Sequence, residues 1–392
     1  MEPWYENRDL GDTNAVHAVV IGVSEYNHLP ERGDPELEGT FGLGQLTTPA
    51  SSAVRFASWL KSPDAGFMFP GAKVASIRLL LSASEVEIDA TPDLADVAQA
   101  VPGPTRANVV EALRDWEEEC LGHPDHVAVL YAAGHGLQLG DKGGGFVLLE
   151  DFAARNAGKL ENMLDIGTTR LAMSRDDAPQ TQLYFVDACR LEPAEFRPYM
   201  ANPKAAALDG EGEGSAHTSV VYFAATPGTA AYGDRAKGTL FSEALAQCMG
   251  GLAGIMTPDG WAVTVGSLID ALSDRLPLLA DQLGTVLAQN PTIGGEYRTS
   301  RTVLHLLSGP PDVDVLIEIA DPAAAPHCRG ALWDGRRQEH VVPSTPFPIA
   351  WKGPAGSYAI DVDADGPFAH LAREKYPLEL YPPPRVETKV PL

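Results

Sequence analysis

Two short apolar segments about fifty residues apart end in reactive side chains. Val127-Ala-Val-Leu-Tyr-Ala-Ala-Gly-His-Gly136 runs into His135, and Leu183-Tyr-Phe-Val-Asp-Ala-Cys-Arg190 runs into Cys189. Continuous runs of β-branched, aromatic and aliphatic residues predict buried strands. An open α/β sheet has its functional crevice at the carboxyl ends of its strands. If the two strands are parallel neighbours, a base and a nucleophile meet at that edge.

The first three hundred residues alternate between strand and helix patterns. Expected strands include Val16–Val23, Ala75–Leu81, Phe146–Leu149 and His217–Thr226, with Thr302–Leu307 as the candidate strand that closes the sheet; expected helices are Pro49–Leu60, Thr105–Trp116, Thr239–Met249 and Val265–Leu283. This alternation predicts an α/β domain over residues 1–308, with a mostly parallel sheet flanked by helices.

The pattern changes at Gly309-Pro-Pro311. From there to residue 392 the chain shows short strands separated by Pro and Gly. We therefore expect a small all-β, sandwich-like C-terminal domain over residues 309–392. Its sequence reveals no chemistry of its own, and we expect it to be regulatory or to bind a target.

Composition excludes several classes of protein. The formal net charge is −24 and no basic run is present, which argues against nucleic-acid binding. No apolar run approaches the roughly 18 residues of a membrane span, and the acidic N-terminus is unlike a signal peptide, so we expect a soluble cytoplasmic protein. The four cysteines lie far apart without a CxxC spacing, which favours neither a zinc site nor a disulfide framework.

No cofactor is expected. Asp361-Val-Asp-Ala-Asp-Gly366 imitates the start of a calcium-binding loop, but Ala372 stands where such a loop requires Glu. We therefore interpret this segment as a solvated turn. A requirement for calcium is left open.

Five sequence blocks carry a family resemblance. They are Ala18–Tyr26, Tyr131–Gly136, Phe185–Cys189, Phe223–Gly228 and Lys237–Phe241. Together and in this order they resemble the caspase-like peptidases, the group of caspases, metacaspases and paracaspases, and we expect a prokaryotic member. The resemblance covers about residues 15–307 and implies a cysteine endopeptidase. The spacing of the histidine and cysteine blocks also agrees with that of caspases.

The resemblance implies a role for each reactive residue. Cys189 is the expected nucleophile and His135 the acid and base, while the backbone amides of Gly136 and Cys189 form the oxyanion hole. Taken singly, such a cysteine is more often a small buried apolar residue, and such a histidine a hydrogen-bonded structural one. Their occurrence in paired blocks favours catalysis.

Specificity is inferred from the residue two before the nucleophile. Caspases have Gln there, and this chain has Asp187, as in metacaspases and paracaspases; a buried carboxylate prefers a cation, so we expect cleavage after Arg or Lys. Asp234 follows Gly233, which stands where caspases have a pocket arginine. Ser52 stands where relatives with basic specificity often have a second acid, and Leu191 replaces a glycine. Whether the pocket holds one carboxylate or two is left open, since Asp234 is otherwise an ordinary loop acid.

Residues 191–216 are rich in Pro, Gly and acids and follow the nucleophile directly. Caspase-like enzymes carry an activation-type loop here, and Arg197 and Lys204 are candidate autocleavage sites, which implies a zymogen. By family habit we expect a stress, cell-death or antiviral defence pathway. The expected partners are a protein substrate with Arg or Lys at the cleavage site and an activator or target bound by the β domain. The alternative is a catalytically silent scaffold that binds a partner through that domain.

Overall fold

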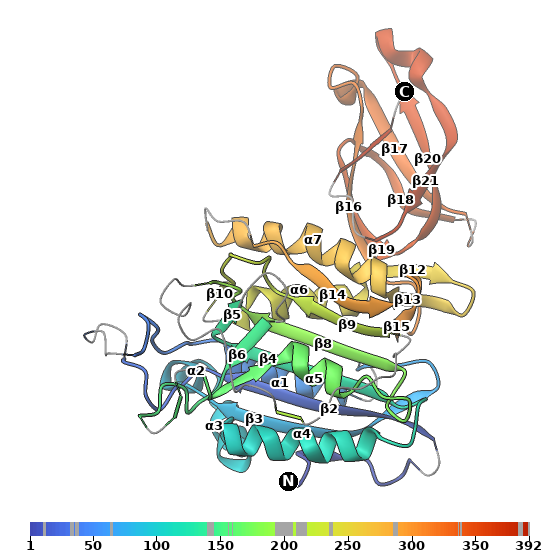
Figure 1. The fold of residues 1–392 in the computed structure, drawn as a ribbon. Coiled ribbons are helices and arrows are strands. Elements are labelled where there is room, and N and C mark those ends of the chain that lie inside the picture. The colour runs from blue at the N-terminus through green and yellow to red at the C-terminus, as the bar shows by residue number, and fades with distance from the viewer. Residues whose placement is uncertain are drawn as a thin grey trace. The chain divides into compact units, whose positions relative to one another are not determined.

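The structure is a computed structural model. It describes all of the chain except residues 11–12, 32–34, 36–38, 63–65, 139–144, 156, 159, 193–206, 209–217, 235–237, 285–288, 336, 338, 383–386 and 391–392, and except the side chains of residues 387–389. The chain divides into two compact units (Figure 1). The first comprises Met1–Ala246 and Leu272–Leu304, and the second comprises Gln247–Ala271 and His305–Leu392.

A seven-stranded sheet forms the centre of the first unit. Its strands, in spatial order, are β1 (Tyr5–Glu6), β3 (Ala72–Ser82), β2 (Asn14–Val23), β4 (Val127–Gly134), β8 (Thr181–Ala188), β9 (Thr218–Phe223) and β14 (Thr292–Tyr297). The five inner strands are parallel, and β1 and β14 pair antiparallel at the edges. The predicted mostly parallel α/β sheet is confirmed.

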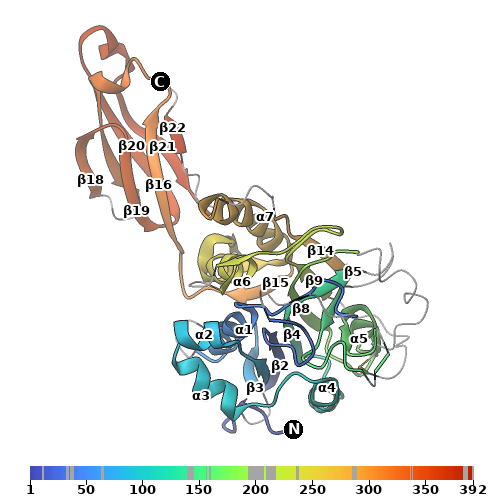
Figure 2. The same ribbon diagram turned by 90° about the vertical axis from the view of Figure 1, so that its left-hand side faces the viewer.

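Helices cover both faces of this sheet. The helices are α1 (Pro49–Leu60), α2 (Glu85–Ala90), α3 (Asp93–Ala100), α4 (Arg106–Cys120), α5 (Ile166–Ala172), α6 (Leu240–Gln247) and α7 (Val265–Gln282). Figure 2 shows α1 and α4 on opposite faces. Trp116 of α4 shares an apolar cluster with Leu130, whereas Phe56 of α1 stacks on Tyr131 with ring centroids 4.6 Å apart. Because successive strand residues point to opposite faces, β4 is covered on both sides, which explains its uninterrupted apolar sequence.

The last strand of the central sheet differs from expectation. β15 (Val303–Leu306) joins a separate three-stranded sheet with β12 (Gly254–Thr257) and β13 (Gly260–Thr264), so the prediction that Thr302–Leu307 closes the central sheet is wrong. The closing strand is β14, antiparallel to β9. Gly294 and Gly295 interrupt its sequence and weaken any strand pattern, and Gly295 has a φ of +85° that favours glycine.

Two small pairings flank the carboxyl ends of the central strands. β5 (Gly136–Gln138), β6 (Gly145–Leu148) and β7 (Met163–Asp165) form one antiparallel sheet, and β10 (Gly233–Asp234) pairs with β11 (Gly238–Thr239). The first begins directly after His135, and the second follows β9 in the chain.

The C-terminal strands of the second unit form a β sandwich. One sheet contains β19 (Ile349–Pro354), β16 (Asp312–Ile319) and β22 (Glu387–Val390), and the other contains β18 (Glu339–Pro346), β17 (Cys328–Asp334), β20 (Gly356–Ala364) and β21 (Arg373–Leu380). Along β16, Val313, Val315 and Ile317 are buried while Asp312 and Asp314 are exposed. This alternation is typical of a strand with one face toward a core. The predicted sandwich-like β region is confirmed.

Candidate active site

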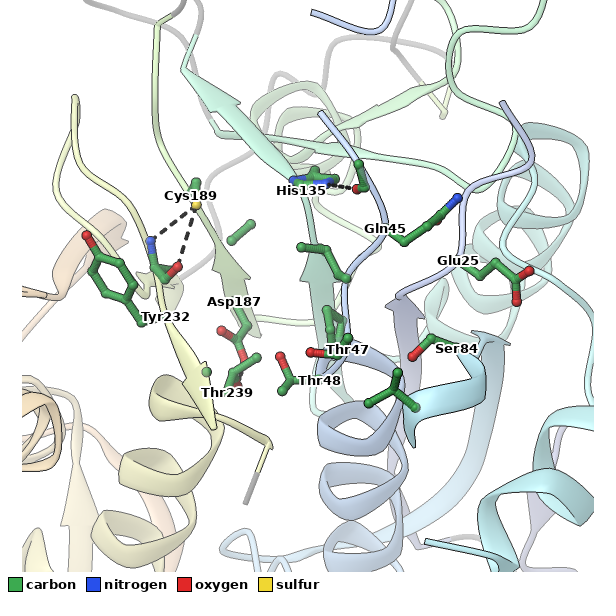
Figure 3. A pocket seen from close by; sticks show the side chains of 18 of the residues that line it. Glu25, Gln45, Thr47, Thr48, Ser84, His135, Asp187, Cys189, Tyr232 and Thr239 are labelled. Carbon is green, nitrogen blue, oxygen red and sulfur yellow. Dashed lines mark hydrogen bonds between the residues drawn. The ribbon is translucent and has the colours of Figure 1, made fainter. Parts of the chain in front are cut away.

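The two reactive residues lie directly beyond neighbouring parallel strands. His135 follows β4 and Cys189 follows β8, and the last residues of these strands, Gly134 and Ala188, are register partners. Both reactive side chains line one cavity of about 860 Å³ (Figure 3). The register therefore brings the two residues to the same edge of the sheet.

Hydrogen bonds fix His135 at both its backbone and its ring. Its backbone N–H donates to Oη of Tyr26 at 2.8 Å, and its Nε2 lies 2.7 Å from the carbonyl oxygen of Gly44. A carbonyl oxygen only accepts, so Nε2 carries the ring proton and Nδ1 retains a free lone pair. Burial lowers the pKa of His135, against the opposing effect of Gly44. The imidazole is therefore neutral at physiological pH, with Nδ1 as its basic atom.

Gln45 holds the loop that supplies the Gly44 carbonyl. Its Oε1 accepts the Tyr26 backbone N–H at 2.7 Å, while its Nε2 donates to the carbonyls of Tyr26 and Leu29, both at 3.0 Å. Sequence reasoning missed Gly44 and Gln45. The contact with histidine uses a backbone carbonyl, which any residue provides, so no residue type marks the position.

The Cys189 thiol is half-buried and contacts the loop after β9. Its Sγ accepts the Ala231 N–H at 3.2 Å. Burial raises the pKa of Cys189, the Ala231 N–H opposes this, and Asp187 adds to it. Within the described part of the chain no hydrogen bond joins this thiol to the His135 ring. The resting pair is thus a neutral thiol and a neutral imidazole, and deprotonation of Cys189 needs His135 as general base.

Gly136 is packed against the nucleophile's own backbone. A Cβ at this position would lie 2.3 Å from the carbonyl oxygen of Cys189 and 2.6 Å from Cβ of Ala188. Such distances exclude a side chain. The space beside the Gly136 Cα is therefore filled by the segment that carries Cys189.

Arg190 anchors the segment after the nucleophile. Its guanidinium donates to Oε1 of Gln138 at 2.7 and 3.0 Å and lies over the ring of Phe223, 4.0 Å from the centroid. Its backbone N–H donates to Thr229, and its carbonyl accepts from Gly228. Burial lowers its pKa. Sequence reasoning gave this residue no role, because its partners come from distant segments.

Asp187 lies at the base of the cavity and is only 2% exposed. Its Oδ2 accepts from Oη of Tyr131 at 2.6 Å and from Oγ1 of Thr239. Its Oδ1 is buried and has no hydrogen-bond partner among the residues that the structure describes. Burial raises the pKa of Asp187 to about 6, although the hydrogen bonds from Thr239 and Tyr131 oppose that rise. The carboxyl is therefore mostly ionised at pH 7.

Asp187 lines the cavity, whereas Ser52 and Asp234 are not among its described lining residues. Ser52 is buried in α1, and its Oγ accepts the backbone N–H of Thr239 at 2.9 Å. Asp234 is half-buried in β10 and is not among the described residues that line the cavity, although its neighbour Gly233 is. Of the acids predicted for the specificity pocket, only Asp187 lines the cavity.

The opposite side of the cavity is also acidic. Glu25, Glu31 and Glu85 line it, and no Lys or Arg occurs among the described residues of the lining. Figure 3 shows Glu25 and Cys189 on opposite sides of His135. Burial raises the pKa of Glu25, and the charges of Glu31 and Glu85 contribute. The described lining of the cavity therefore suits a cationic ligand.

Other predicted features can be placed only in part. Arg197 and Lys204, with most of the 191–216 loop, lie outside the described residues. Over the described residues, no group of three or more His, Cys, Asp and Glu side chains is arranged to hold a metal ion. In the segment Asp361–Gly366, which imitates a calcium loop, Oδ1 of Asp361 accepts the backbone N–H of Lys375 at 2.7 Å.

None of the helices in the described ranges is long and apolar enough to cross a membrane.

Comparison with known proteins assigns the family. The family model for the caspase domain matches residues 15–294, which include both reactive segments and Asp187. The chain belongs to the caspase family. This membership supports a caspase-like cysteine peptidase in general terms. It also agrees with the resemblance carried by the histidine and cysteine blocks.

Two individual proteins are similar to this caspase-family chain. The uncharacterized protein y4kE of Sinorhizobium fredii is 25% identical over 270 residues, which cover 67% of this chain and 76% of that protein. The crystal structure of caspase-1 from Spodoptera frugiperda aligns with 12% identity and a TM-score of 0.38, covering 79% of this chain and 95% of that one.

Proposed function

We propose that this caspase-family protein is a cysteine endopeptidase that cleaves protein chains after Arg or Lys. The observation that carries the proposal concerns Asp187, in the cavity that also contains Cys189 and His135: its buried Oδ1 has no hydrogen-bond partner in the described part of the chain. A buried carboxylate oxygen without a donor is costly, and a guanidinium or ammonium group supplies the missing donor together with a compensating charge.

The proposed reaction uses a Cys–His dyad. Nδ1 of His135 takes the thiol proton as Sγ of Cys189 attacks the scissile carbonyl, and the protonated imidazole then gives this proton to the departing amine. Backbone N–H groups of Gly136 and Cys189 stabilise the oxyanion of each tetrahedral intermediate. Water hydrolyses the resulting thioester, with His135 again as base, and releases the carboxylate product and the thiol.

The same carboxylate disfavours the specificity of caspases for Asp. A substrate aspartate would bring a second negative charge beside Asp187 and beside the glutamates of the cavity. Like charges in a site of low dielectric repel strongly. Cleavage after Asp is therefore the outcome that the proposal excludes.

The direct test uses fluorogenic peptides that end in Arg, Lys or Asp before the leaving group. The full-length protein is compared with its Cys189→Ala variant, with and without added calcium. We expect the wild-type protein to release the fluorogenic group from the Arg and Lys peptides only. The Cys189→Ala variant should release it from none of the peptides. Cleavage of the Asp peptide, or equal cleavage of any peptide by the Cys189→Ala variant, would contradict the proposal.

A silent scaffold is the second candidate. The neutral thiol and the absence of a bond between Cys189 and His135 in the described chain favour it, although such bonds are often long before substrate binds. It predicts that no peptide is cleaved and that a partner protein binds through the β sandwich.

Regulation as a zymogen in a stress, cell-death or defence pathway is part of the proposal. The basic residues Arg197 and Lys204 suit the proposed specificity, so the enzyme can cut its own loop. The β sandwich is the proposed site for an activator or target. Intact-mass analysis tests the first point: full activity of an uncut chain would rule out activation by cleavage.

A further inference from the structure

The two oxygens of Asp187 have unequal surroundings. Oδ2 accepts hydrogen bonds from Tyr131 and Thr239, whereas no described residue forms a hydrogen bond with the buried Oδ1. The three residues come from three different segments, β4, β8 and β11. A carboxylate free to rotate would share its donors between both oxygens, so the side chain is held in one orientation.

Each hydroxyl is positioned by a contact of its own. The Tyr131 ring stacks on Phe56 at an interplanar angle of 18°. Oγ1 of Thr239 accepts the backbone N–H of Ser242 at 3.1 Å, and the Thr239 N–H donates to Ser52 at 2.9 Å. Oγ1 accepts the Ser242 N–H through a lone pair, and its single proton is donated to Asp187.

Tyr131 is a donor at every physiological pH. Burial and the adjacent Asp187 raise the pKa of its phenol well above the usual value, against the opposing effect of Thr239 and Arg55. A neutral phenol next to a carboxylate donates its proton and accepts nothing from it. Both hydroxyls therefore stabilise the ionised form of Asp187.

We infer that Tyr131 and Thr239 are positioning residues for substrate specificity: by holding Oδ2 they leave Oδ1 of Asp187 to meet the charged end of the substrate side chain. The inference rests on the proposed function, because it describes how the same pocket selects Arg or Lys. Neither residue takes part in bond making. Their effect is on the orientation and charge of Asp187.

The same two hydrogen bonds keep the pocket anionic at neutral pH. Removal of one hydrogen bond to a charged carboxylate raises its pKa by about one to two units. Starting from about 6, the pKa of Asp187 would move to about 7 or 8, so that a large fraction becomes neutral at pH 7. Among the described residues, the titratable groups nearby are Tyr131 on β4, Cys189 beyond β8, and the Arg55–Glu243 ion pair of α1 and α6.

The test compares the pH profiles of single-atom variants of the full-length protein. Tyr131→Phe keeps the stack on Phe56 but lacks the hydroxyl, Thr239→Val lacks the second hydroxyl, and Thr239→Ser retains it. Tyr184→Phe is the matched control, since Tyr184 lies on β8 and its hydroxyl donates to Gln182 away from the cavity. kcat and KM are measured from pH 5 to 8.5 on a peptide ending in Arg and on one ending in citrulline, its neutral isostere.

For Tyr131→Phe and Thr239→Val we expect the acidic limb of kcat/KM on the Arg peptide to move up by about one to two pH units. At pH 7 kcat/KM should fall about two- to tenfold, mainly through KM, while the citrulline peptide is unaffected. Thr239→Ser and Tyr184→Phe should behave as wild type. If the acidic limb of kcat/KM does not move, or if kcat/KM falls equally on the Arg and citrulline peptides, the inference is overturned. The two residues would then have a purely structural role.

Binding gives a readout that does not depend on turnover. Fluorescence anisotropy measures the affinity of a labelled Arg-terminated peptide for Cys189→Ala, alone and combined with Tyr131→Phe. The inference predicts weaker binding of the double variant at pH 7 and equal binding at pH 8.5. Equal affinity at both pH values would contradict it. If Cys189→Ala does not bind the peptide and the wild type does not cleave it, the proposed function itself fails, which is a distinguishable result.

Discussion

Nε2 of His135 lies 2.7 Å from the carbonyl oxygen of Gly44, and this contact decides which ring nitrogen can act as a base. The proton is held on Nε2, so Nδ1 is the atom that can receive the Cys189 proton. The Gly44 carbonyl is thus a third component of the site beside the proposed dyad. Its position depends on Gln45, which ties the loop to Tyr26 and Leu29.

Replacement of Gln45 by Ala should lower kcat with little change in KM. The variant loses three hydrogen bonds that place the Gly44 carbonyl, and the His135 ring becomes free to change its tautomer. We expect kcat to fall about 10- to 100-fold, within the usual contribution of a positioned acid or base. Nitrogen-15 chemical shifts of the His135 ring should show a mixed tautomer. Thr47→Ala, which changes a neighbouring cavity residue, is the control; an unchanged tautomer in Gln45→Ala would refute this role.

Asp187→Asn should remove the preference for basic residues while keeping the local hydrogen bonds. An asparagine oxygen still accepts from Tyr131 and Thr239, but the charge is lost. Hydrogen bonds to a charged partner contribute about 1.5–3 kcal/mol, so kcat/KM for Arg peptides should fall on the order of 10- to 100-fold. The ratio of Arg to citrulline cleavage is the measurement. A variant that keeps the wild-type ratio would show that Asp187 does not select the cation.

The same variant should be more stable than the wild type above pH 6. Burial raises the folded-state pKa of Asp187 from 3.8 to about 6, so ionisation favours the unfolded chain. The wild type therefore loses stability as pH rises from about 4 to 6, by roughly 3 kcal/mol for a shift of about two units. Urea unfolding at pH 4 and 7.5 measures this. Asp187→Asn should gain stability at pH 7.5 and none at pH 4, and a gain of equal size at both would contradict the account.

Gly136→Ala should damage both stability and the nucleophile's position. The new Cβ would lie 2.3 Å from the Cys189 carbonyl, and because that contact is backbone, relief requires the segment to move. Overpacking of this kind costs about 1–3 kcal/mol. Thermal unfolding and reactivity of Cys189 toward iodoacetamide are the readouts. Gly250→Ala, where a Cβ meets nothing within 4 Å, is the matched control and should leave both unchanged.

The sequence contained the signals for the strands and the reactive residues at their ends. Uninterrupted apolar runs marked β4 and β8, and a reactive residue just beyond each run could only lie at the sheet edge. Asp187 was recognisable from its distance of two residues to Cys189. These features are local, since each is set by residues within one strand.

What the sequence could not show depends on contacts between distant segments. Tyr131, Asp187 and Thr239 meet only because three segments converge, and nothing near Thr239 indicates that its hydroxyl reaches a carboxylate 52 residues earlier in the chain. The Gly44 contact uses backbone atoms and leaves no residue signature. β14 escaped notice because its two glycines weaken the strand pattern, although pairing with β9 stabilises it.

Unbiased mapping of cleavage sites tests the central claim most directly. The purified protein and its Cys189→Ala variant are each incubated with a denatured protein mixture, and the new termini are identified by mass spectrometry. The account predicts cuts after Arg and Lys with the wild type and none with the variant. Cuts after other residues, cuts that persist without Cys189, or the absence of any cut would contradict it.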